Sequence, residues 1–146
     1  MSLSLATPLA KPSLRLRIPA AIVRFDGLFL LIVGAWAMTL EAVGHFIGAG
    51  PLAHLANSPY TIGGFEAHGL AAIIGWLLWR GASGLALKPW HRCAMLVHAL
   101  LGASNLAFWG SFVAFDAVAV GVATTIVHVL FVIAHACCVV QAAARK

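Results

Sequence analysis

The chain has 146 residues, of which 62% are hydrophobic and only 9% are charged, and its mean hydropathy is +0.99. A soluble domain usually carries about 25% charged residues. Water would solvate poorly the surface of a domain of this length that has so few charged residues. The composition therefore excludes a soluble globular protein and predicts that a lipid bilayer surrounds most of the chain.

The formal net charge of +5 is distributed as a membrane topology signal rather than as a nucleic-acid-binding patch. The nine basic residues precede, separate or follow the apolar stretches: Lys11, Arg15, Arg17, Arg24, Arg80, Lys88, Arg92, Arg145 and Lys146. Segments 49–60 and 113–117 contain no Lys or Arg. Because loops on the cytoplasmic side are rich in basic residues, the pattern predicts cytoplasmic N- and C-termini in a multi-pass protein of the cell inner membrane.

The first 21 residues are expected to form a flexible, basic, cytoplasmic arm, since Pro8, Pro12 and Pro19 interrupt them. Residues 22–146 are expected to form the transmembrane domain. A helix needs about 20 apolar residues to cross a bilayer, and such segments occur at about 22–47, 61–80, 91–113 and 117–142. Short links between them force antiparallel neighbours. The sequence thus predicts an all-α fold, an up-down bundle of four transmembrane helices.

Ionisable side chains inside these apolar segments are the main functional signal, because they are costly in lipid and usually face the protein interior. On the third segment His91, His98 and Asn105 recur every seven residues. On the fourth, His128 and His135 do the same. Residues spaced in this way share a helix face, so the polar faces of the helices are expected to meet inside the bundle.

A first cluster, predicted near the outer face, has the chemistry of a metal site. Glu41 and His45 are four residues apart on one helix face, and Glu66 and His68 lie on the next segment. Imidazole and carboxylate groups are ligands of zinc, iron and copper. Glu66 and His68 are two residues apart, so both cannot point fully inward. The alternative interpretations are a hydrogen-bonded network that sets the helix register and a proton pathway.

A second cluster, predicted near the cytoplasmic face, has the chemistry of a haem site. His98 and His135 lie at similar depth on antiparallel neighbours and could be the two axial ligands of one haem b. His128, closer to the bilayer midplane, is a further candidate for cofactor binding. The alternative is that each imidazole bonds a group on a neighbouring helix. Asp26 and Asn105 are expected to be structural polar residues.

Two segments resemble the DoxX-like family of small membrane proteins. One is Arg24-Phe-Asp-Gly27, which leads to Gly34, at the start of the first helix. The other is Gly63-Gly-Phe-Glu66-Ala-His-Gly69, which runs to Gly75 and Arg80. The resemblance implies a four-helix bundle that accompanies a quinone- or thiol-linked oxidoreductase.

The sequence leaves three functions open and identifies no catalytic residue. The first is a redox-associated membrane protein, an oxidoreductase or a subunit of one, that binds a haem, a transition metal or a quinone through its intramembrane histidines and glutamates. The second is a proton-coupled transporter or channel-like oligomer. The third is a structural accessory subunit of a membrane complex. The expected partners are the lipid bilayer and either further copies of the chain or a larger membrane complex, with no nucleic acid.

Overall fold

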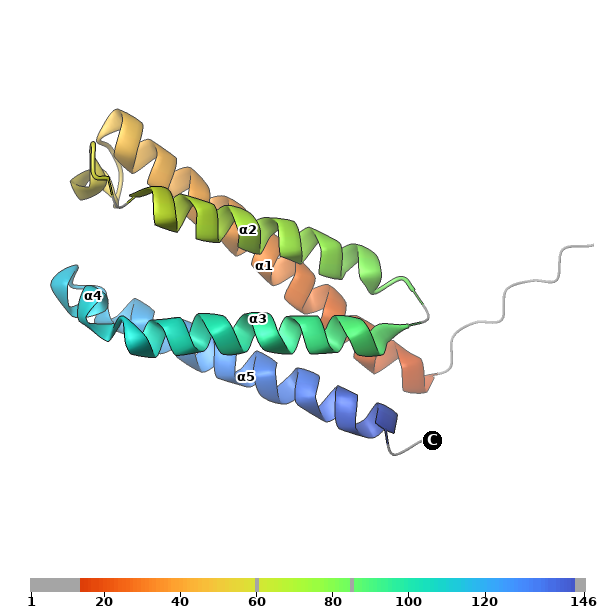
Figure 1. Ribbon diagram of the computed structural model, residues 1–146. Coiled ribbons are helices and arrows are strands. Elements are labelled where there is room, and N and C mark those ends of the chain that lie inside the picture. The colour runs from red at the N-terminus through yellow and green to blue at the C-terminus, as the bar shows by residue number, and fades with distance from the viewer. Residues whose placement is uncertain (1–13, 60, 85, 144–146) are drawn as a thin grey trace, which may run out of the picture.

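A computed structural model describes residues 14–59, 61–84 and 86–143, and all of their regular secondary structure is helical. The elements are α1 (Leu14–Ile47), the 3-10 helix η1 (Ala53–Leu55), α2 (Thr61–Gly81), α3 (Leu87–Ala107), α4 (Trp109–Ala114) and α5 (Val118–Ala143) (Figure 1). The predicted all-α class is confirmed for these residues.

Three of these helices are long and apolar enough to cross a membrane, over Ile18–Ile47, Thr61–Gly81 and Val118–Ala142. This supports the prediction of a membrane protein. Helix α3 has 21 residues, as many as α2, but it carries Lys88, Arg92 and several polar residues, which lower its hydropathy. A fourth crossing by α3 therefore stays a prediction.

The long helices form two pairs, α1 with α2 and α3 with α5 (Figure 1). Glycines allow α1 and α2 to approach closely. A Cβ added to Gly27 would lie 2.5 Å from the backbone nitrogen of Trp79, and one added to Gly34 would lie 2.6 Å from the carbonyl oxygen of His68. Small residues at such contacts are typical of helix pairs in membranes, where close packing drives association.

The two pairs meet over a small core near the end of the bundle where α1 begins. This core consists of Val23, Leu30, Leu78, Ala82 and Ala94. The same end carries the basic residues Arg24, Arg80, Lys88 and Arg92 and is called the basic end below (Figure 1). The opposite end holds η1, the start of α2 and α4, and is called the acidic end, after Glu41, Glu66 and Asp116.

Two helices, α1 and α3, have boundaries that differ from the prediction. Helix α1 begins at Leu14, so residues 14–21 of the predicted arm are helical; residues 1–13 lie outside the described residues. Pro19 is inside this helix, where its missing N–H removes one backbone hydrogen bond from the second turn. The predicted helix over 91–113 begins earlier, at Leu87, because Pro89 falls in its first turn, where N–H groups lack helical partners. It also ends earlier, at Ala107, and α4 follows.

Candidate functional site

Asp26 on α1 is completely buried and accepts a hydrogen bond at each of its two carboxylate oxygens. Oδ1 is 2.7 Å from Nε2 of His98 on α3, and Oδ2 is 2.9 Å from Nε2 of His135 on α5. Both imidazoles are also completely buried. One carboxylate thus joins three helices and connects the two helix pairs.

Each of these histidines bonds a further histidine through its other ring nitrogen. Nδ1 of His135 is 2.8 Å from Nδ1 of His91, and Nδ1 of His98 is 2.9 Å from Nδ1 of His128. The result is an unbroken run of five titratable side chains in the order His91, His135, Asp26, His98 and His128. We call it the Asp26–histidine chain.

The hydrogen bonds can be satisfied by one assignment of protons. An ionised carboxylate only accepts, so the Nε2–H groups of His98 and His135 both donate to Asp26. Their Nδ1 atoms then accept from the Nδ1–H groups of His128 and His91. This assignment follows from satisfying the network, since hydrogens are not located directly. It leaves Nε2 of His91 as a buried acceptor without a hydrogen-bond partner among the described residues.

The antiparallel register of α3 and α5 produces this arrangement. A step of seven residues forward along α3, from His91 to His98, is matched by seven residues back along α5, from His135 to His128. Two turns of helix separate the two histidine pairs by about 10 Å. Seven residues farther along α3, Asn105 donates to the hydroxyl oxygens of Thr124 and Thr125 at 3.0 and 3.2 Å. The predicted meeting of these two polar faces is therefore observed.

Aromatic rings cover one side of the chain. Phe131 stacks on the imidazole of His98, with ring centroids 4.5 Å apart and planes inclined by 12°. The rings of Phe25 and Phe29 on α1 pack against the ring of Phe131, with centroid-to-centroid distances of 6.0 and 5.3 Å. The Asp26 carboxylate itself has no exposed surface, so its hydrogen bonds act in a medium of low polarity, where they are electrostatically stronger.

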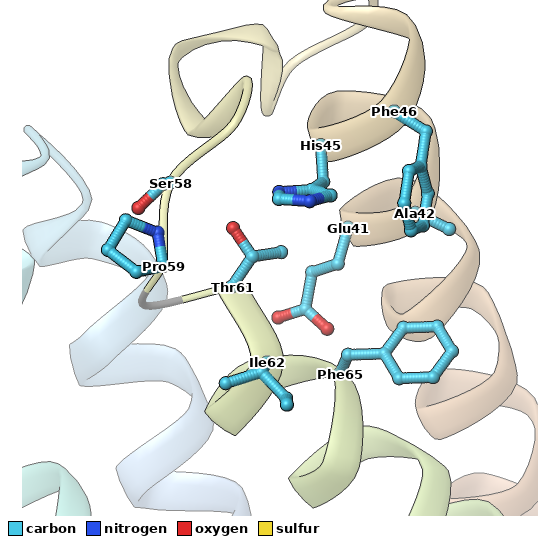
Figure 2. A pocket seen from close by; sticks show the side chains of 9 residues that line it. All are labelled: Glu41, Ala42, His45, Phe46, Ser58, Pro59, Thr61, Ile62 and Phe65. Atoms are coloured by element: carbon cyan, nitrogen blue, oxygen red, sulfur yellow. The ribbon is translucent and has the colours of Figure 1, made fainter.

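The predicted outer cluster is only partly assembled. Glu41 Oε1 is 3.1 Å from Nδ1 of His68, and His45 lines a pocket together with Glu41 (Figure 2). Glu66, in contrast, is exposed on α2. Among the described residues, no three His, Cys, Asp or Glu side chains are grouped so that they could hold one metal ion. The metal interpretation of Glu41, His45, Glu66 and His68 therefore receives no support.

The inner cluster contains the three predicted histidines, His98, His128 and His135, but in a different role. Both Nε2 atoms that would ligate a haem, those of His98 and His135, instead bond the same carboxylate. Ligation of a haem by these atoms would require both bonds to break. Haem binding stays a prediction that this geometry does not favour.

Sequence reasoning missed two members of the chain. His91 was assigned to the polar face of α3 but not to the site, and Asp26 was expected to be only a structural polar residue. The seven-residue spacing of His91 and His98 was the available signal for the first. For Asp26 no spacing pattern within one helix was available, because its partners lie on α3 and α5.

Comparison with family models, curated proteins and solved structures gives no match for this chain. The resemblance to the DoxX-like family thus stays a prediction.

Proposed function

We propose that this protein is a four-crossing protein of the inner membrane that holds and transfers protons through the Asp26–histidine chain. The observation that carries the proposal is the unbroken run of hydrogen bonds across five titratable side chains. This develops the proton-pathway interpretation of the sequence, in preference to the redox-associated one.

The bonding of the two inner imidazoles suits proton transfer. An imidazole relays a proton when it accepts at one ring nitrogen and donates from the other. His98 and His135 are bonded at both nitrogens, so a proton that arrives at His91 can shift the bonds through His135 to Asp26, and one that arrives at His128 can shift those through His98 to the same carboxylate. Passage from one end to the other then requires the second arm to reverse its hydrogen bonds, with both of its imidazoles changing tautomer, before Asp26 gives up the proton. The outer histidines offer the two ends: His91 has a buried Nε2 without a hydrogen-bond partner among the described residues, and His128 is partly exposed.

Burial of the carboxylate supplies a reason for the chain to hold a proton. A buried anion in a membrane span is costly unless a positive charge compensates it. Within the part of the chain that the structure describes, the hydrogen-bond partners of Asp26 are His98 and His135, and none is a Lys or Arg. One additional proton shared among the imidazoles would make the whole chain electrically neutral.

The polar face has the length needed for a membrane path. From His91 to Asn105 it extends over fourteen residues of α3, or about 21 Å, of a hydrocarbon core about 30 Å thick. In the proposed topology α3 is the third crossing in chain order, and its N-terminus, at the basic end, lies in the cytoplasm. The Asp26–histidine chain then begins near the cytoplasmic face. Asn105, with Thr124 and Thr125, extends the polar face of α3 and α5 toward the outer face.

Proton flux into liposomes tests this function. The purified protein would be reconstituted with a trapped pH-sensitive dye, and a potassium diffusion potential would drive proton entry. Wild-type protein should acidify or alkalinise the lumen according to the sign of the potential. Asp26→Asn, which retains the side-chain volume, should reduce the rate to that of protein-free vesicles.

The matched control is His54→Gln, because His54 is an exposed histidine of η1, packed against Phe115 and outside the chain. This variant should conduct like the wild type. Flux that is equal in wild type and Asp26→Asn, or absent from both, would show that the chain does not transfer protons.

A further inference from the structure

A second polar feature lies at the acidic end, in a pocket formed by α1, α2 and the segment that joins them (Figure 2). Its volume of about 420 Å³ falls within the range of small-molecule sites, about 300–1,000 Å³. Much of the wall is apolar, from Phe46, Pro59, Ile62 and Phe65. A pocket of this kind binds the apolar body of a ligand, and its few polar groups select the head group.

Two polar atoms of this pocket are buried and lack a hydrogen-bond partner within the described residues, Oε2 of Glu41 and Nδ1 of His45. Glu41 is only 7% exposed, and its other oxygen, Oε1, bonds His68. Figure 2 shows the side chains of Glu41 and His45 extending from α1 toward the start of α2, where Thr61 lies. Buried polar atoms are nearly always paired, and an unpaired carboxylate oxygen is costly. The pocket therefore suits a ligand that donates hydrogen bonds.

The charges around the pocket favour a cation. No Lys or Arg occurs between Arg24 and Arg80, so neither α1 beyond its first third nor the link to α2 supplies a permanent positive charge. Glu66 on α2 is exposed and does not line the pocket, so Glu41 supplies its negative charge. A positively charged ligand would complement the Glu41 carboxylate, whereas an anion would be repelled by it.

We propose that this pocket binds a protonated primary amine carried on a small apolar body. The ammonium group has three donors, of which one can reach Oε2 of Glu41 and another Nδ1 of His45. The apolar body lies against Phe46 and Phe65, whose ring faces also attract cations. This site lies at the opposite end of the bundle from the Asp26–histidine chain, so it does not depend on proton transfer.

Calorimetric titration of the full-length protein in detergent with 2-phenylethylammonium tests the proposal. The probe carries a primary ammonium group on one aromatic ring. The neutral analogue 2-phenylethanol has nearly the same shape and measures binding by apolar contact alone. We expect saturable binding of the amine and binding of the alcohol that is weaker by roughly ten- to hundredfold, the effect of losing a charge-assisted hydrogen bond.

Glu41→Gln is the main variant, and Glu66→Gln is its matched control with the same charge change on an exposed residue. Glu41→Gln should weaken amine binding by roughly ten- to hundredfold, while Glu66→Gln should leave it almost unchanged. Equal affinity in wild type and Glu41→Gln would overturn the proposal. So would an equal loss in both variants, because that result indicates attraction to surface charge, and so would the absence of saturable binding to the wild type.

A second pair of variants leaves both glutamates in place. A Cβ added to Gly64 would collide with the Glu41 carboxylate, whereas one added to the neighbouring Gly63 would meet nothing within 4 Å. Gly64→Ala should therefore displace the carboxylate and weaken amine binding, and Gly63→Ala should not. Asp26→Asn should bind the amine like the wild type, which separates failure of this site from failure of the proton chain.

Discussion

Asp26 has no exposed surface, yet both oxygens of its carboxylate are occupied by imidazole donors from two other helices. Replacing Asp26 should therefore change the stability of the protein as well as its proton transfer, because two buried N–H groups would lose the acceptor that they share. An amide has the same shape but presents one donor where the carboxylate presents an acceptor. At least one imidazole of the chain must then change tautomer or lose its partner.

Asp26→Asn should for this reason lower the free energy of unfolding by about 1–3 kcal/mol, the cost of leaving a buried donor or acceptor unsatisfied. Asp116→Asn makes the same chemical change on an exposed residue of the α4–α5 link, where asparagine tolerates the positive φ of 52°, and should change stability by less than about 0.5 kcal/mol. Unfolding in mixed micelles with increasing sodium dodecyl sulfate measures both. Equal stability of the two variants would mean that the buried hydrogen bonds contribute little.

Sequence reasoning at this scale succeeded where one helix supplies the whole pattern. The stripe that contains His98 and Asn105 follows from a spacing of seven, and the matching stripe on α5 follows in the same way. The exposure of Glu66 was half anticipated, since it and His68 cannot both face inward. The joining of Asp26 to His98 and His135 is a contact over 72 and 109 residues, and no local pattern encodes it.

Helix α2 shows how far a single element can be predicted. Its expected range of 61–80 agrees with Thr61–Gly81, because glycine and proline interrupt the chain before it and Gly81 and Gly84 follow its last apolar turn. The end of α3 at Ala107 was not predicted, since no proline or glycine stands at Phe108 and the apolar composition continues through α4. Helix boundaries set by proline and glycine can thus be predicted from the sequence, whereas those set by packing cannot.

The approach of α2 to α1 gives a prediction for Gly75. A Cβ at this position would collide with the backbone of α1, at Leu31 and at the carbonyl oxygen of Gly27. Because backbone atoms cannot move aside as side chains do, Gly75→Ala should separate the helices and lower the free energy of unfolding by about 1–3 kcal/mol. Gly63→Ala on the same helix has open space and should be neutral or stabilising by up to about 1 kcal/mol. The same detergent unfolding measures the difference, and equal effects would contradict the observed close packing.

Over the whole molecule, two features lie at opposite ends of the long helices. The basic end holds the Asp26–histidine chain close to Arg24, Lys88 and Arg92, and the acidic end holds the amine pocket. The overall class could be predicted from composition because charge is scarce everywhere except between the apolar segments. Composition does not give the number of crossings. The polar residues of α3 that form its part of the Asp26–histidine chain also lower the hydropathy from which a crossing would be predicted.

Labelling of single cysteines from each side of the membrane separates four crossings from three. In a background with Cys93, Cys137 and Cys138 replaced by alanine, Pro51→Cys and Ala114→Cys place thiols in exposed positions at the acidic end, and restored Cys93 is exposed near the basic end. If α3 crosses, an impermeant maleimide should label positions 51 and 114 from outside intact cells and position 93 only in inverted vesicles. If α3 remains on the cytoplasmic side, position 114 should be labelled with position 93. That outcome would remove the membrane path along α3 and, with it, the transfer of protons from one face of the bilayer to the other.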